Sequence, residues 1–190
     1  LSEIDPFVVA LLTQRFPDVP NLGDMTTLPT RFASGEVEAP DVLVGGTPCQ
    51  GFSVAGLRAG LGDARSNLAL CFVEIADAID AARLRLRKPP CIIVWENVPG
   101  VLSSKDNAFG CFLGALCGAD AALELESTNR DKLERKWPRA GLVAGPRRRV
   151  AWAVLDVQHF GVPQRRRRVF AVASACDFEL DLGAGFDPGE

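Results

Sequence analysis

Several signals that mark common classes of protein are scarce or absent in these 190 residues. Histidine occurs once, at His159, and none of the six cysteines belongs to a Cys-x-x-Cys pair, so the usual ligand sets of zinc sites are missing. The longest apolar runs, such as Cys91–Trp95, are too short to cross a bilayer, and no secretory signal stands at the start. We therefore expect no metal site, no membrane span and no secretion.

The cysteines are expected to be reduced, because a domain of this length can bury a core without disulfide bonds. Reduced cysteines predict a cytoplasmic protein. Cys49 has glycine and proline neighbours and stands apart from the others. The remaining five fit best as small buried apolar residues, namely Cys71, Cys91, Cys111, Cys117 and Cys176.

The net charge of −3 hides an uneven distribution of charge along the chain. Residues 130–168 contain twelve Lys or Arg against three Asp or Glu, a net charge of +9, so the remainder carries −12. A basic segment on an acidic body favours a polyanionic partner, with nucleic acid the first candidate. On composition alone, a solvated charged face is an equally good interpretation.

Short apolar runs alternate with helical stretches, which predicts an α/β fold whose sheet is covered by helices on both faces. Functional side chains of such sheets lie just beyond the carboxyl ends of the strands. Glu3 and Asp24 are also expected at strand ends. The predicted strands are 41–46, 91–97, 148–157 and 167–174, and the predicted helices are 67–87, which ends before two prolines, and 107–118.

The stretch VGGTPCQGFS, Val44–Ser53, places a cysteine on a loop directly after a predicted strand. A loop cysteine is accessible, and its thiolate is a strong nucleophile when a partner activates it. The usual partner is a histidine, and only His159 exists, in a predicted strand-to-loop segment. A cysteine–histidine hydrolase is therefore weakly supported.

Two other motifs offer partners for that cysteine. Glu96 directly follows an apolar strand, where a carboxyl group can hold or donate a proton, although a structural acid is the more common role there. In the stretch QRRRR, 164–168, alternate side chains of an extended segment share a face, so Arg166 and Arg168 point one way. A plain basic surface run is the simpler interpretation of the arginines alone.

Together these three groups fit attack on an aromatic base. A thiolate adds to carbon 6 of cytosine, a carboxyl group protonates or hydrogen-bonds ring nitrogen 3, and an arginine binds the ring oxygen. Carbon 5 then becomes nucleophilic and takes a methyl group. No histidine is needed.

In these motifs the chain resembles the DNA cytosine-5 methyltransferases, and the sequences of the motifs are most similar to those of the bacterial and phage members. TPCQGFS matches the Pro-Cys-Gln nucleophile loop, ENV the Glu-Asn-Val motif, and QRRRR the Gln-x-Arg-x-Arg motif. The resemblance covers about residues 2–173 and implies an S-adenosylmethionine-dependent methyltransferase fold, a Rossmann-like mixed sheet. It implies methyl transfer to carbon 5 of a cytosine flipped out of double-stranded DNA, in a bacterial cell or phage-infected host, with restriction-modification as one setting.

The resemblance also implies roles for individual residues. Cys49 is the nucleophile, Glu96 contacts ring nitrogen 3 and the exocyclic amine, Arg168 contacts the ring oxygen, and Arg166 helps to hold the loop. The positions implied at the DNA or the target base are Gln50, Ser53, Asn97 and Gln164.

The implied cofactor is S-adenosylmethionine, and no metal is implied. In SEID, Glu3 would hold the ribose hydroxyls, with Ile4 beside the adenine. In GDMT, Asp24 would bind the adenine amine, with Met25 beside the ring. The two other cofactor positions are Pro48, near the methyl donor, and Leu68, in GDARSNL.

Two parts of the family pattern have no match: the first strand with its Phe-x-Gly-x-Gly cofactor loop, and the target-recognition domain. We therefore expect residues 1–175 to form a partial catalytic domain that lacks both, and 176–190 to be an acidic tail that starts a further region. A second polypeptide could supply the unmatched parts. The alternatives are a truncated, non-catalytic DNA-binding remnant or a subunit of a split methyltransferase, and a cysteine enzyme acting on pyrimidine nucleotides.

Overall fold

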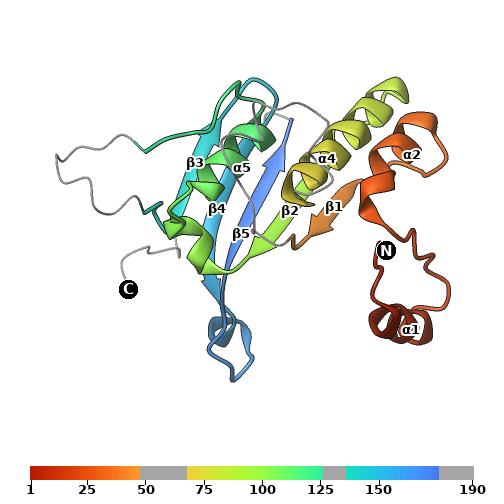
Figure 1. Ribbon diagram of the computed structural model, residues 1–190, viewed down its shortest axis with the longest axis horizontal. Coiled ribbons are helices and arrows are strands. Elements are labelled where there is room, and N and C mark those ends of the chain that lie inside the picture. Colours follow the sequence, from red (N-terminus) through yellow and green to blue (C-terminus); the bar gives the residue numbers. More distant parts are fainter. Residues whose placement is uncertain (48–67, 126–135, 176–190) are drawn as a thin grey trace.

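The computed structural model describes residues 1–47, 68–125 and 136–175 of the chain (Figure 1). The helices are α1 (Pro6–Arg15), α2 (Leu28–Ser34), α4 (Leu68–Arg85) and α5 (Ala108–Cys117), with short 3₁₀ turns η1 (Met25–Thr27), η3 (Pro99–Ser103) and η4 (Val157–Phe160). The strands are β1 (Val42–Gly45), β2 (Ile92–Asn97), β3 (Ala140–Ala144), β4 (Arg149–Asp156) and β5 (Arg167–Ser174).

The described strands form one mixed sheet in the order β1-β2-β5-β4-β3. β1 and β2 are parallel, with Val44 opposite Val94, and α4 is the crossover that parallel neighbours require. The pairings β2–β5, β4–β5 and β3–β4 are antiparallel. The mixed α/β fold predicted from the sequence is confirmed.

One face of this sheet carries the main hydrophobic core. Trp95 of β2 is fully buried and stacks on Phe112 of α5, with ring centroids 4.1 Å apart. Phe109 of α5 meets Trp137 and Trp152 edge to face, each at 5.5 Å. α4 contributes to the same cluster, and its other side packs on α2 (Figure 1).

Two glycines within α5 allow the chain that follows the helix to pack directly on it. A Cβ at Gly110 would lie 2.2 Å from the carbonyl oxygen of Leu123, and one at Gly114 would lie 2.5 Å from that of Ala121. Glycines weaken a helix in isolation. Here they bring the 121–123 backbone close enough for the Leu123 N–H to donate to the Gly110 carbonyl at 3.0 Å.

The opposite face is more open. Val42 and Val44 of β1 are 47% and 69% exposed, and Ile92 of β2 is 47% exposed. α1, which lies apart from the sheet in Figure 1, has no buried residue. Within the described residues, α4 and α5 pack on one face of the sheet, and α1 contributes no buried residue.

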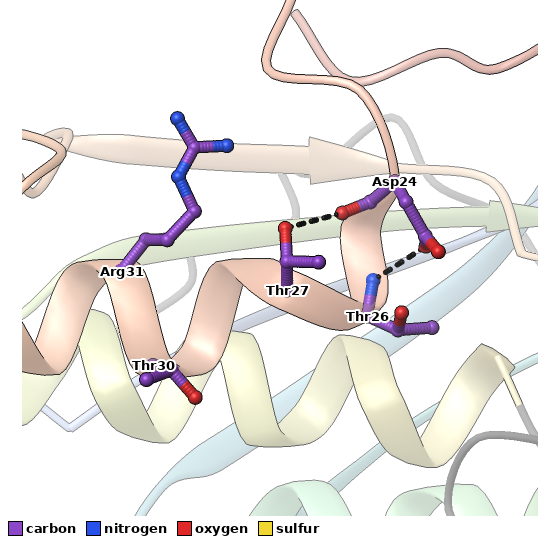
Figure 2. Close-up of a pocket in the computed structure, with 5 residues that line it drawn as sticks. All are labelled: Asp24, Thr26, Thr27, Thr30 and Arg31. Atoms are coloured by element: carbon purple, nitrogen blue, oxygen red, sulfur yellow. Dashed lines mark hydrogen bonds between the residues drawn. The ribbon is translucent and has the colours of Figure 1, made fainter.

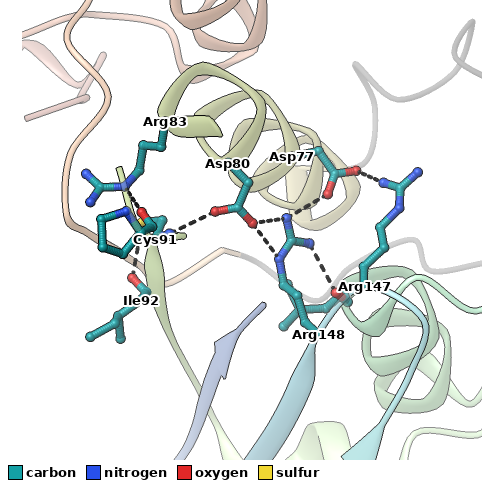
Figure 3. A network of polar contacts seen from close by, with 9 residues as sticks. Asp77, Asp80, Arg83, Cys91, Ile92, Arg147 and Arg148 are labelled. Carbon is teal, nitrogen blue, oxygen red and sulfur yellow. Dashed lines mark hydrogen bonds and ion pairs between the residues drawn. The ribbon is translucent and has the colours of Figure 1, made fainter. Parts of the chain in front are cut away.

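A buried arginine connects three parts of the fold (Figure 3). The guanidinium of Arg148, just before β4, is 2% exposed and pairs with Asp77 at 2.8 Å and Asp80 at 2.7 Å, both on α4. It also donates to the carbonyl oxygen of Leu116 on α5. Asp80 in turn accepts from the N–H of Cys91 at the start of β2, so the network fixes α4 and α5 against two strands.

Among the described residues, no helix is both long and apolar enough to span a membrane.

Candidate active site

Glu96 and Arg168 form an ion pair at the carboxyl end of β2. The antiparallel register places Glu96 opposite Phe170, so Arg168 lies two residues away along the neighbouring strand. Arg168 Nε lies 2.8 Å from Glu96 Oε1, and the side chains are 22% and 34% exposed. Two charged groups expected to act on one ring therefore meet at one partly accessible point.

Thr47 ties the start of the predicted nucleophile loop to the same end of the sheet. Its hydroxyl accepts from the indole N–H of Trp95 at 2.9 Å, and its carbonyl accepts from the amide of Asn97 at 2.7 Å. A Cβ at Gly46 would lie 3.1 Å from Glu96 Oε2, so glycine allows the close approach of the two strand ends. The four residues predicted within that loop, Pro48, Cys49, Gln50 and Ser53, lie outside the described residues.

Asn97 is 7% exposed, and its described contacts are to the protein's own backbone. Its amide donates to the Thr47 carbonyl, and its carbonyl oxygen accepts from the N–H of Val98 at 2.8 Å. A contact of Asn97 with DNA or the target base stays a prediction. Through the hydrogen bond to Thr47, the Asn97 side chain holds the ends of β1 and β2 together.

The arginine run leads into β5 from an exposed loop. Arg167 pairs with Asp156 at 3.2 Å, while Arg168 pairs with Glu96, so neighbouring arginines go to different carboxylates. Arg166 is joined to its surroundings through its backbone, whose N–H donates to Asp156 Oδ1 at 3.1 Å. Gln164 is exposed, and its N–H donates to the Val162 carbonyl at 2.7 Å. The described contacts do not bring Arg166 or Gln164 to Glu96.

A polar pocket of about 620 Å³ lies beside one predicted cofactor residue (Figure 2). Asp24 caps η1 by accepting from the N–H of Thr26 at 2.9 Å, and its carbonyl accepts from the Thr27 hydroxyl at 2.8 Å. The next residue, Met25, packs against both core clusters. The lining residues are Asp24, Thr26, Thr27, Thr30 and Arg31.

Hydrogen bonds hold Glu3 and Asp24 on neighbouring segments. The side chain of Asn21 accepts from the N–H of Glu3 at 3.0 Å and donates to its carbonyl at 2.9 Å, and Ser2 donates to the Gly23 carbonyl. The Glu3 carboxylate accepts from the N–H groups of Ile4 and Asp5. The predicted strand ends are wrong here: Glu3 precedes α1 and Asp24 precedes a 3₁₀ turn, because neither segment has a strand partner in the described part of the chain.

This arrangement fits the adenosine part of S-adenosylmethionine, whose ribose hydroxyls and adenine amine are hydrogen-bond donors. Carboxylates at Glu3 and Asp24 can accept hydrogen bonds from hydroxyl and amine groups, and the pocket at Asp24 is lined by polar side chains. Ile4 is 72% exposed and presents an apolar side chain next to Glu3. Leu68, the first residue of α4, is half-buried. The six cofactor contacts stay predictions.

The described cysteines have the character of core residues. Cys71, Cys91, Cys111 and Cys117 are all buried and free. Burial, then the carboxylates of Glu74 and Asp24, raises the pKa of Cys71 to about 11. Burial, with Asp80, also raises the pKa of Cys91 to about 11, and burial raises the pKa of Cys111. Cys71, Cys91 and Cys111 therefore stay protonated at neutral pH. The burial of all four cysteines confirms their interpretation as core residues.

The sequence analysis missed two residues that organise the site, Thr47 and Asp156. Thr47 accepts from the ring N–H of Trp95 and the amide of Asn97, and Asp156 accepts from two backbone N–H groups and two side chains. Such contacts leave no pattern in the sequence. One signal was available for Asp156, since it is one of only three acids among the twelve cations of residues 130–168.

Comparison with known proteins adds independent evidence. The family model of the C-5 cytosine-specific DNA methylases matches residues 1–117, a range that includes Glu3, Asp24, Cys49 and Glu96.

Relatives that match nearly the whole chain include the following three. A protein named DNA N-6-adenine-methyltransferase, from Escherichia phage P1, is 55% identical over 188 residues, covering 92% of this chain and 25% of the relative. The type II methyltransferase M.NgoBV of Neisseria gonorrhoeae is 31% identical over 91% of this chain and 33% of its own length. The type II methyltransferase M.AquIA of Picosynechococcus is 30% identical over 90% of this chain and 60% of its own length.

The chain thus spans between a quarter and three fifths of the length of these relatives. The family match covers more than half of the chain, and the mixed sheet brings Glu96 of the Glu-Asn-Val motif and Arg168 of the Gln-x-Arg-x-Arg motif together at one end. On this evidence, the chain belongs to the C-5 cytosine-specific DNA methylase family.

Proposed function

We propose that this chain carries the catalytic groups of a DNA methyltransferase that methylates carbon 5 of cytosine in double-stranded DNA. The observation that carries the proposal is the Glu96–Arg168 ion pair beside Thr47, which precedes Cys49 by two residues. Nucleophile, acid and oxygen-binding cation would then converge on one pyrimidine ring.

In the proposed reaction, the Cys49 thiolate forms a bond to carbon 6 while the electron pair of the 5,6 double bond moves toward carbon 5. Glu96 donates a proton or hydrogen bond to ring nitrogen 3, which offsets the charge that develops on the ring. A guanidinium has five N–H donors, so Arg168 can hold Glu96 and the ring oxygen together. After methylation, loss of the proton on carbon 5 expels the thiolate and restores the double bond.

S-adenosylmethionine would supply the methyl group. We propose that Glu3 and Asp24 hold its ribose and adenine, with Ile4 and Met25 beside the ring, and that Pro48 and Leu68 lie nearer the methyl donor. The polar pocket at Asp24 and the hydrogen-bonded approach of the 2–3 and 21–23 segments support this assignment.

Methylation of adenine N6 is the second candidate function, because the Escherichia phage P1 relative carries that activity in its name. The match covers a quarter of that relative, so three quarters of it lie outside the aligned part. An exocyclic amine can attack a methyl donor directly and needs no protein thiol. The Pro-Cys-Gln loop and the Glu96–Arg168 pair favour cytosine.

Nucleoside analysis separates the two. The chain is incubated with S-adenosylmethionine and duplex DNA, the DNA is digested, and the nucleosides are identified by mass spectrometry. We expect 5-methylcytosine, and we expect Glu96→Gln to lower its rate of formation about 100-fold or more, as loss of a general acid does. The matched control is Glu38→Gln, at an exposed acid paired with Lys88, which should keep the wild-type rate.

N6-methyladenine as the product would overturn the cytosine assignment, and so would 5-methylcytosine formed at full rate by Glu96→Gln. Salt-sensitive DNA binding with no methylated base at all would favour the non-catalytic remnant or split subunit. In that case we propose that a second polypeptide supplies the cofactor loop and the recognition region. If methylation appears when a polypeptide carrying the cofactor loop and the recognition region is added, the proposal of a split methyltransferase is supported.

A further inference from the structure

We propose that Asp156 is a positioning residue: its carboxylate joins the two ends of the loop between β4 and β5 and thereby holds Arg168 against Glu96. What the Glu96–Arg168 pair does in catalysis rests on the proposed function. The joining of the loop ends does not, and it can be tested without any methyl transfer.

The contacts of Asp156 reach both ends of the loop. Asp156 is the last residue of β4, and its Oδ1 accepts from the N–H of Gln158 at 3.3 Å on the outgoing side and from the N–H of Arg166 at 3.1 Å on the returning side. Its Oδ2 lies 3.2 Å from Gln158 Nε2 and 3.2 Å from Arg167 Nε. One carboxylate therefore receives donors from both sides.

The loop itself offers little packing that could hold those ends. Residues 158–167 are all exposed, including Phe160 and Val162 at 65% and 44%. The loop extends beyond the end of the sheet in Figure 1. A backbone hydrogen bond from the N–H of Val157 to the Arg166 carbonyl closes the same point. The polar contacts at its base therefore act together with the β4–β5 ladder to fix the start of β5.

The start of β5 sets the position of Arg168. Asp156 pairs with Arg167 in the β4–β5 ladder, and Leu155 pairs with Arg168. When Asp156 binds the N–H of Arg166, the returning chain leaves the loop in a fixed direction two residues before Arg168. Arg168 then reaches Glu96 on the other neighbouring strand, with 2.8 Å between Nε and Oε1.

The carboxylate is charged in this setting. It is 8% exposed, and burial by itself would raise the pKa of Asp156. Hydrogen bonds from Gln158, Arg166 and Arg167, together with the charge of Arg167, outweigh burial, so the pKa lies below its ordinary value. At neutral pH the group is therefore an acceptor at both oxygens.

The first test uses the Nε–H signal of Arg168 in nitrogen-15 NMR spectra of the chain, assigned by its loss in Arg168→Lys. Asp156→Ser keeps a side-chain oxygen that can cap η4 but is too short to reach Arg166 as well. We expect the Arg168 signal to move to the position of a solvent-exposed arginine. Arg167→Gln and Asp156→Asn, which leave an oxygen for the Arg166 N–H, should keep the wild-type signal.

An unchanged Arg168 signal in Asp156→Ser would overturn the proposal, and so would its loss in Arg167→Gln or Asp156→Asn. Should Asp156→Ser fail to fold, hydrogen exchange in the unchanged chain decides instead. One opening of the loop base releases both groups, so the Arg166 N–H and the Arg168 Nε–H should exchange with protection factors within about threefold of each other. Free exchange of Arg166 with Arg168 still protected would contradict the proposal.

A kinetic test then applies where methyl transfer is detected. We expect Asp156→Ser to lower the single-turnover rate about tenfold or more, because misplacement of a catalytic group is costly. In an Arg168→Ala background the same change should add less than a twofold loss, since its effect passes through Arg168. A full additional loss in that background would show a general structural effect and overturn the positioning role.

Discussion

Three segments that are distant in sequence meet at Glu96: the end of β1, the end of β2 and the start of β5. Arg168 reaches it from β5, Gly46 approaches it from the end of β1, and Thr47 is bound to the residues on either side of it, Trp95 and Asn97. The Glu96–Arg168 ion pair by itself contributes modestly to stability, because it is partly exposed. The shared consequence of these contacts is positional: the chain that leads to Cys49 and the proposed acid are held at one end of the sheet.

The buried thiols give a prediction at the residue scale. With pKa values of about 11, Cys71 and Cys91 hold about one thiolate per thousand molecules at pH 8. Iodoacetamide at pH 8 should therefore leave both unmodified in the native chain, with labelling increasing only as the pH rises toward 11 or the chain unfolds. Peptide mass spectrometry measures this. Rapid labelling of either residue at pH 8 would show that it is not buried as described.

At the scale of elements, Arg148 and Arg147 provide a matched pair, because both contact Asp77 and their exposure differs. Arg148 is 2% exposed and Arg147 61%. Removing one partner of a buried ion pair leaves the other charges uncompensated, so Arg148→Met should lower the free energy of unfolding by about 3–5 kcal/mol. The exposed pair contributes little, so Arg147→Met should cost less than about 1 kcal/mol.

Urea unfolding of the two variants measures the difference. Equal losses in both would mean that Arg148 does not connect α4, α5 and the sheet as described.

The elements that the sequence predicted are those whose pattern is set by burial. The four predicted strands end within one residue of β1, β2, β4 and β5, and 67–87 and 107–118 correspond to α4 and α5. Each has an apolar run or stripe that packs into the core. α1 and β3 were not predicted. α1 has no buried residue, so burial does not impose a pattern on it. β3 is a short strand that contains Ala and Gly, and its pairing with β4 is set by tertiary structure.

The candidate site could not be predicted from the hydrophobic pattern of the sequence alone. Taken singly, Glu96 favoured a structural role and the arginines a surface role. Only their combination with Cys49, followed by the family resemblance, joined them in one site. Their contact requires β2 and β5 to be neighbours, which the order of elements along the chain does not determine. Thr47 and Asp156 could not be predicted because their partners are set by tertiary structure.

At the scale of the whole molecule, the basic segment contributes less external charge than its composition suggests. Four of its arginines, Arg147, Arg148, Arg167 and Arg168, pair with carboxylates of the protein itself. Arg165 and Arg166 lie exposed in the loop next to the candidate site. We therefore predict that the first contacts with a DNA backbone would lie at that loop, where cations attract phosphate without reading sequence.

The central claim is that Cys49 attacks cytosine within the site marked by Glu96 and Arg168. The most direct test mixes the chain with S-adenosylmethionine and duplex DNA containing 5-fluorocytosine and measures intact mass. Fluorine on carbon 5 leaves no proton to remove, so the thiolate cannot be expelled. We predict a protein–DNA adduct whose mass includes the transferred methyl group and which is absent in Cys49→Ser. An adduct that persists in Cys49→Ser, or methylated cytosine formed by that variant, would contradict the account.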